Sequence, residues 1–92
     1  GIAFGNSSGP SQYARDGETT YDHQGGIIRN NFIFRNQPGD VGISVNKAKD
    51  FQIVNNTVIL QGTFPWTIEY RFPVTQGVVA NNLTDGDILS RD

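Results

Sequence analysis

The chain carries the stretch Ile28-Arg29-Asn30-Asn31-Phe32-Ile33, the first of three similar stretches in its 92 residues. The second is Ile53-Val54-Asn55-Asn56-Thr57-Val58, and the third is Val79-Ala80-Asn81-Asn82-Leu83-Thr84. The Asn-Asn pairs thus recur at an almost constant interval along the chain. A period of about 25 residues is typical of repeat architectures, in which each repeat stacks on the next to bury its apolar face.

A second series of short apolar stretches accompanies the Asn-Asn pairs. It consists of Ile2-Ala3-Phe4, Ile43-Ser44-Val45, Ile68-Glu69-Tyr70 and Ile88-Leu89-Ser90. The alternation within each stretch predicts strands of a few residues. Leu and Ala total seven residues, whereas Val, Ile and Thr total 23, so strand formers greatly outnumber helix formers. The chain is therefore predicted to be all-β.

Each Asn-Asn pair lies between two predicted strands with no other connecting residues. A sharp two-residue bend needs a residue near the left-handed region, which Asn tolerates best after Gly. The side-chain amide of Asn can also bond to the Asn one coil away. The repeat therefore predicts a ladder of Asn side chains along the stack.

The pattern Ile-x-Asn-Asn-x-Val, alternating with short Gly-Ile-x-Val strands, resembles the right-handed parallel β-helix of the pectate-lyase-like superfamily. The resemblance covers residues 26–92, and 1–5 if the opening strand belongs to the stack. It implies one β-helix segment over residues 1–92, a solenoid of about three coils with one long loop excursion at about 6–25. It also implies a secreted or cell-surface location. This architecture carries lyases, hydrolases, epimerases, tailspikes and adhesins, so it leaves the activity open.

The stacking predicts which side chains form the core and what happens at the ends. The chain has no Met and opens on an apolar stretch, which indicates a fragment of a longer β-helix. Exposed coil ends are unpaired edges, so end-to-end self-association is expected. The predicted inward positions are Ile2, Phe4, Ile28, Ile33, Ile43, Val45, Ile53, Val58, Ile68, Tyr70, Val79 and Ile88.

Composition excludes several other partners and sites. The formal net charge of −2 argues against nucleic-acid binding, which needs a basic stripe. No apolar run approaches the roughly 18 residues of a membrane span. The absence of Cys excludes disulfides, thiolate nucleophiles and Cys-based zinc sites.

The first candidate site is the loop at 6–25, which is longer than its predicted counterparts on later coils, the six-residue turns at 46–51 and 72–77. Long excursions from a rigid scaffold often carry function. It contains His23, the single histidine of the chain, next to Asp22. His23 could act as a general base, or could bind a metal beside Asp22. The alternative is that His23 bonds to the backbone of the loop and only holds it in place.

The second candidate is the outward face of the strands at 43–45, 67–71 and 88–91. Alternation places Glu69 and Arg71 on this face, with Arg91 one coil away. The resemblance implies a lyase site in which a basic side chain takes a proton while acidic side chains hold calcium. Only one acid lies on the face and calcium needs six to eight oxygens, so no metal ligands are assigned and calcium remains an open cofactor. The alternative is a surface ion pair.

The third candidate is the aromatic stretch at 64–73, which contains Trp66. An exposed Trp can stack on the apolar face of a sugar ring, while Arg or Glu fixes its hydroxyls or carboxylates. Together with Trp66, Arg91 and Asp22 are the candidate substrate-binding residues, and Arg71, Glu69 and His23 are the candidate catalytic ones. The alternative is that Trp66 closes a turn over the core.

Three functions remain at this point. The first is a repeat segment of an extracellular polysaccharide-binding or polysaccharide-processing protein that is not catalytic alone. The second is a lyase-like enzyme acting on an acidic, uronate-containing polysaccharide. That hypothesis expects a cleft over Glu69, Arg71 and Arg91, walled by the loop at 6–25, with His23 pointing into it. The third is a structural, adhesin-type solenoid with no sugar chemistry.

Overall fold

A computed structural model describes residues 1–5, 17 and 20–91 of the chain. This part is all-β: it contains no helix, and so no helix that could cross a membrane. Its strands are β1 (Ile2–Phe4), β2 (His23–Gln24), β3 (Ile27–Arg29), β4 (Phe32–Phe34), β5 (Ile43–Asn46), β6 (Ala48–Val54), β7 (Thr57–Ile59), β8 (Trp66–Arg71), β9 (Gln76–Ala80), β10 (Leu83–Thr84) and β11 (Asp87–Ser90).

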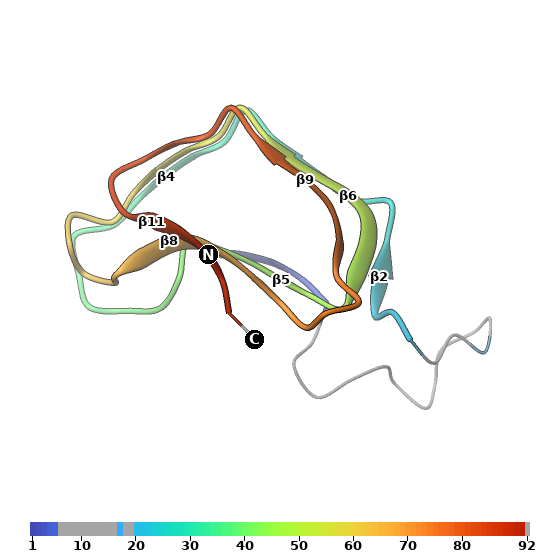
Figure 1. Ribbon diagram of the computed structural model, residues 1–92. Coiled ribbons are helices and arrows are strands. Elements are labelled where there is room, and N and C mark those ends of the chain that lie inside the picture. The colour runs from blue at the N-terminus through green and yellow to red at the C-terminus, as the bar shows by residue number, and fades with distance from the viewer. Residues whose placement is uncertain (6–16, 18–19, 92) are drawn as a thin grey trace.

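The strands form three sheets in which all recorded pairs are parallel. One sheet has the order β1-β5-β8-β11 and the second the order β10-β7-β4, while in the third β6 pairs with β2, β3 and β9. From β5 onward the chain passes through the three sheets in a constant order and then returns to the first. We call one such passage a circuit: the first ends with β4, the second comprises β5–β7, the third β8–β10, and β11 starts a fourth. Viewed along the stack, successive circuits superpose and the sheets enclose a common interior (Figure 1), an arrangement compatible with a β-solenoid.

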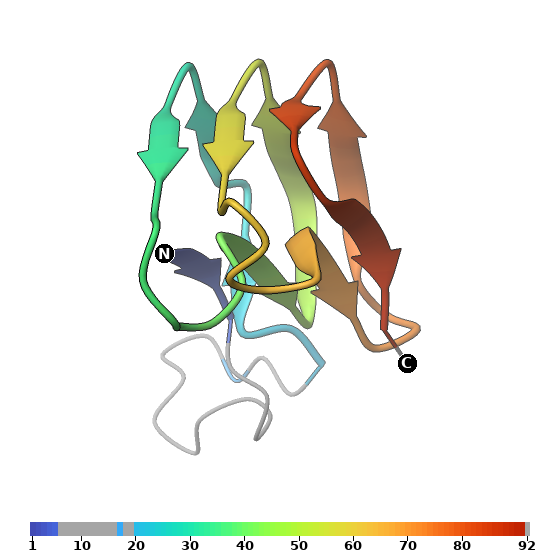
Figure 2. The same cartoon turned by 90° about the vertical axis from the view of Figure 1, so that its left-hand side faces the viewer.

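The sequence repeat corresponds to the register of the sheets. Ile2 pairs with Ile43, Ile43 with Ile68 and Ile68 with Ile88, so the second series of stretches lies in one sheet, as predicted. Figure 2 shows the strands of successive circuits side by side. The interval from Ile68 to Ile88 is shorter than that from Ile43 to Ile68, mainly because the connection from β10 to β11 is shorter than that from β7 to β8. The register also shifts between Asp87 and Ile88.

The two residues of each Asn-Asn pair have different structural roles. The first Asn of each pair has a left-handed backbone, with φ of 57°, 57° and 56° at Asn30, Asn55 and Asn81. The second forms the ladder: the backbone N–H and the Nδ2 of Asn31 both lie 3.0 Å from the Oδ1 of Asn56. Asn56 donates in the same way to the Oδ1 of Asn82, again at 3.0 Å. The predicted bend and ladder are confirmed.

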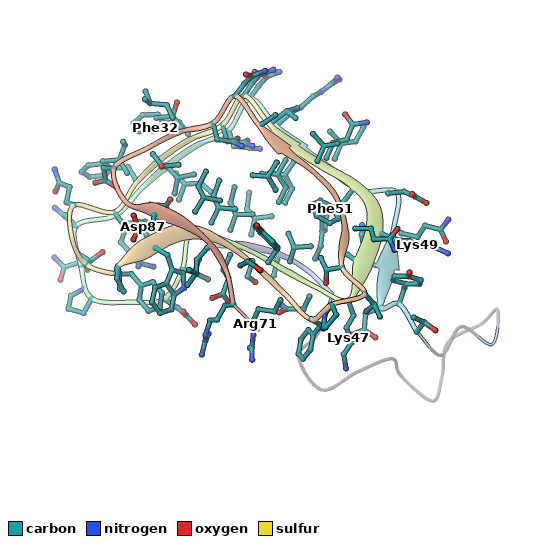
Figure 3. All side chains as sticks on the ribbon, viewed as in Figure 1. Phe32, Lys47, Lys49, Phe51, Arg71 and Asp87 are labelled. Atoms are coloured by element: carbon teal, nitrogen blue, oxygen red, sulfur yellow. The ribbon has the colours of Figure 1, made fainter. Side chains whose placement is uncertain are left out.

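The core lies between the sheets and consists of aliphatic side chains with one aromatic ring. Most of the predicted inward positions are buried or packed against the core, but Ile88 is 44% exposed because no circuit covers it. Phe51 points into the interior, whereas Phe32 and Lys49 point outward (Figure 3). The sequence analysis missed Ala48, Phe51 and Leu60. The buried apolar residues are Ile28, Ile43, Val45, Ala48, Phe51, Ile53, Val58, Leu60 and Ile68.

Two connections differ from the sequence prediction. The six-residue turn expected at 46–51 is a single-residue bend, because Lys47 adopts a φ of 48° and β6 begins at Ala48. Much of the loop expected at about 6–25 lies outside the described residues, but its last part is not loop. His23 and Gln24 form β2, which pairs with Ala48 and Lys49 of β6.

Candidate functional site

The outer face of the β1-β5-β8-β11 sheet brings together Trp66, Glu69 and Arg91. The Nε1 of Trp66 donates to the Oε2 of Glu69 at 2.8 Å, and the Nη1 of Arg91 lies 3.3 Å from the same oxygen. The guanidinium of Arg91 also lies 5.6 Å from the centre of the Trp66 ring. Residues at the start of β8, in its middle and after β11 thus form one contact cluster.

Strand register explains this cluster. Glu69 pairs with Leu89, so Arg91, two residues further, emerges on the same face. The backbone N–H of Arg91 donates to the carbonyl of Tyr70 at 3.0 Å, which fixes the chain just after β11. Phe64 then packs edge-on against Trp66, with ring centroids 4.9 Å apart and an interplanar angle of 78°. The indole is held between an aromatic edge and a cation.

The environment of Glu69 limits its chemical role. Its side chain is only 7% exposed, while that of Arg91 is 49% exposed. The Oε2 of Glu69 already accepts from two donors, and charge-assisted bonds of this kind are the stronger ones in proteins. Glu69 is therefore suited to positioning Trp66 and Arg91. Arg91 presents the more accessible charge.

A second cluster lies where β8 leads into β9. The Nζ of Lys47 lies 4.7 Å from the centre of the Phe72 ring, and the guanidinium carbon of Arg71 lies 5.1 Å from it. Arg71 pairs in register with Asn46, so Lys47 and Phe72 follow equivalent positions on neighbouring circuits. The sheet face carrying Glu69 is thus flanked by two half-buried aromatic rings, Trp66 and Phe72, each with a cation above it.

His23 and Asp22 are not brought to this face. His23 belongs to the sheet of β6, and its ring stacks on Phe4 with centroids 4.1 Å apart and an interplanar angle of 9°. Its buried Nε2 has no hydrogen-bond partner in the described part of the chain. The backbone N–H of Asp22 donates to the carbonyl of Lys47 at 2.9 Å. The convergence of His23 with Arg71 and Glu69 that the lyase hypothesis expects is not seen.

Two hollows lie near β6 and β9. One, of about 250 Å³, is lined by Phe51, Tyr70, Thr75, Gly77 and Val79, which belong to the interior and to the turn before β9. The other, of about 340 Å³, is lined by residues 50–52 and 76–78. Neither is lined by the Trp66 cluster.

Acidic groups do not gather into a metal site within residues 1–5, 17 and 20–91, where no three His, Asp or Glu side chains lie together. One carboxyl has a shifted pKa. The backbone N–H groups of Leu60 and Gln61 donate to Asp85 at 3.0 and 2.8 Å and hold the pKa of this carboxyl below its usual value. Asp85 therefore ties the end of one circuit to the next, which is a structural role.

The sequence analysis missed Lys47 and gave no individual role to Phe72 or Phe64, although both lie in the candidate aromatic stretch at 64–73. A signal for the first two existed, because Lys47 and Phe72 are separated by one period of the repeat. That spacing places the two residues on equivalent positions of neighbouring circuits. For Phe64 no comparable signal exists, since it belongs to the irregular segment before β8.

Comparison of the chain with protein-family models, with curated proteins and with solved structures gave no match.

Proposed function

We propose that the chain is a segment of a right-handed parallel β-helix that binds polysaccharide on the outer face of the β1-β5-β8-β11 sheet. The constant order of the sheets, their parallel register and the Asn ladder support the β-helix assignment. Its handedness follows from the resemblance in sequence, as does a secreted or cell-surface location.

One observation carries the binding role: two aromatic rings, Trp66 and Phe72, flank one sheet face, and each has a cation close above it. The cation lies 5.6 Å from the ring centre at Trp66 and 4.7 Å from it at Phe72. Aromatic rings bind the apolar faces of sugars, and neighbouring Arg or Lys side chains bond to hydroxyl or acidic substituents. The strands hold both rings on a rigid frame, so little order has to be gained on binding.

The same cluster favours binding over catalysis by this segment alone. Glu69 is engaged by Trp66 and Arg91, and its side chain is 7% exposed. A general base must reach the proton that it abstracts in the bound substrate. With Glu69 occupied and His23 stacked on Phe4, the candidate catalytic residues do not form a nucleophile–base or acid–base pair.

A glycan-binding assay on the purified chain, with neutral, uronate-containing and sulfated polysaccharides and with and without calcium, tests this proposal. Trp66→Ala and Arg91→Ala are each expected to weaken binding about tenfold or more. Phe32→Ala is the control, because Phe32 is 71% exposed on another sheet. Absence of binding by a folded sample, or equal losses in all three variants, would refute the proposal, and absence of binding would leave a structural solenoid.

A further inference from the structure

The corner between β8 and β9 concentrates positive charge around one ring. Lys47 comes from the second circuit and Arg71 from the third, and both approach the ring of Phe72, at 4.7 and 5.1 Å from its centre. Figure 3 shows Lys47 and Arg71 outside the ribbon at this corner. Among the described residues the recorded ion pair is Arg91 with Glu69, so neither cation of this corner is neutralised there by a carboxylate.

The residue that carries this ring has an unusual backbone conformation. Phe72 has a φ of 75°, which is rare for a bulky side chain and is found mostly where a turn or a function requires it. The backbone N–H of Thr75 donates to the carbonyl of Phe72 at 3.0 Å. The hydroxyl of Thr75 donates to the carbonyl of Arg71 and accepts from the backbone N–H of Lys47 at 3.0 Å. One turn therefore holds all three members of the cluster.

Two buried polar atoms at this corner have no partner. The Nε of Arg71 is a buried donor, and the Oδ1 of Asn46 is a buried acceptor, and neither makes a hydrogen bond within the part of the chain that the structure describes. Asn46 is itself only 8% exposed. Asn46 and Arg71 pair in register on neighbouring strands, so this donor and this acceptor belong to adjacent residues and do not by themselves indicate a missing ligand. Arg71 as a whole is half-buried, so this corner presents the charges of its guanidinium and of Lys47.

We propose that Lys47, Arg71 and Phe72 form a binding site for an oxyanion, the sulfate or carboxylate substituent of an acidic polysaccharide. Such a group neutralises the guanidinium of Arg71 and the Nζ of Lys47, and the ring of Phe72 contacts the apolar face of the sugar that carries it. The anion site follows from the local contacts alone, whereas the choice of a saccharide as the carrier rests on the proposed function.

Inorganic sulfate tests the anion site directly. In a titration followed by NMR of the arginine side chains, the Nε–H signal of Arg71 is expected to shift in a saturable manner, and that of Arg29, which is exposed on β3 in another sheet, much less. A titration in which the Arg71 signal does not move, or in which every Arg signal moves equally, would overturn the anion site.

Matched lysine variants test the polysaccharide carrier. Lys47→Ala is expected to weaken binding of dextran sulfate or polygalacturonate about tenfold at low salt. The control is Lys49→Ala, because it removes the same charge from a lysine that also lies over an aromatic ring, 4.6 Å from the centre of Tyr21. Lys49→Ala should change binding less than twofold, and Arg71→Gln should behave as Lys47→Ala does. Equal losses in the two lysine variants would mean unspecific charge attraction and would overturn the site.

The outcomes separate this proposal from the polysaccharide-binding role. Binding of dextran sulfate or polygalacturonate that is lost in Trp66→Ala but unaffected in Lys47→Ala would retain the polysaccharide-binding role and refute the oxyanion site. A specific shift of the Arg71 signal on addition of sulfate, without binding of any polysaccharide, would retain the anion site. It would refute the proposal that a polysaccharide carries the anion. Comparison of dextran sulfate with polygalacturonate then decides whether sulfate or carboxylate is the preferred group.

Discussion

Replacing Asn56 by alanine is expected to lower the free energy of unfolding by about 2–4 kcal/mol. Asn56 is the middle member of the ladder and is 1% exposed. Its Oδ1 accepts from the backbone N–H and the Nδ2 of Asn31, both at 3.0 Å. Its Nδ2 donates to the carbonyl of Ile28 and to the Oδ1 of Asn82, also at 3.0 Å.

The magnitude follows from the groups that alanine would leave unpaired. The carbonyl of Ile28 lies in a buried bond, and losing its partner costs about 1–3 kcal/mol. The backbone N–H of Asn31 is only partly buried, so its loss adds about 1 kcal/mol. The total stability of a 92-residue domain is about 5–14 kcal/mol, from about 0.05–0.15 kcal/mol per residue, so this change is a large fraction of it.

Urea unfolding at neutral pH, followed by the fluorescence of the single Trp and by circular dichroism, measures the effect. The matched control is Asn31→Ala at the end of the ladder, where the Nδ2 of Asn31 bonds to an exposed carbonyl of Arg29. We expect this variant to lose about 1 kcal/mol or less. A loss below about 1 kcal/mol for Asn56→Ala, or equal losses for the two variants, would refute the role assigned to the ladder.

Three further changes have directions that the structure fixes. Because the pKa of Asp85 is lowered in the fold, its ionised carboxylate stabilises the fold above the ordinary pKa of 3.8, and this stabilisation is lost as the pH falls through the lower pKa of the folded state. The difference between the free energies of unfolding at pH 6 and at pH 3 should therefore be smaller in Asp85→Asn than in the parent. Glu69→Gln keeps an acceptor for Trp66 but removes the ion pair with the half-exposed Arg91. The free energy of unfolding is expected to fall by about 1 kcal/mol or less, with a shifted Trp emission. A loss above about 3 kcal/mol would mean that the pair is a major stabiliser. Gly77→Ala would place a Cβ 2.5 Å from the ring of Phe51 and should destabilise the fold by about 1–3 kcal/mol in urea unfolding, while an unchanged midpoint would show that the ring can move away.

Much of the fold could be predicted because a stack repeats one local pattern. Residues at one period occupy equivalent positions, so a single alternation such as Ile43-Ser44-Val45 also describes Ile68-Glu69-Tyr70. The bend at Lys47 could not be predicted in the same way. Its φ of 48° is unusual for Lys, and the sequence analysis assigned the sharp bends to the Asn-Asn pairs. Without that bend, Ala48 and Phe51 were assigned to a turn rather than to the core.

The candidate site was only partly predictable. The strand register brings Arg91 close to Glu69, as alternation along neighbouring strands predicts. The rotamer that turns Trp66 toward Glu69 depends on packing against Phe64, from the irregular segment before β8, which has no periodic signal. The position of His23 follows the repeat, because His23 pairs with Ala48 one period later, but β2 has only two residues and was assigned to the loop.

Stability and the proposed binding face are linked through the last strand. Seven of the nine buried apolar residues belong to 43–60, the circuit that has a neighbour on both sides. By contrast β11, among the strands that the structure describes, pairs with β8 alone, and Ile88 within it is 44% exposed. Arg91 follows this edge strand directly, so the contacts of Arg91 with Glu69 and Trp66 exist only while β11 is docked. Lys47 follows β5, which pairs with β1 and β8, and Arg71 ends β8, which stays paired with β5 when β11 frays. The oxyanion site should therefore persist under conditions in which β11 frays and the Trp66 cluster is lost.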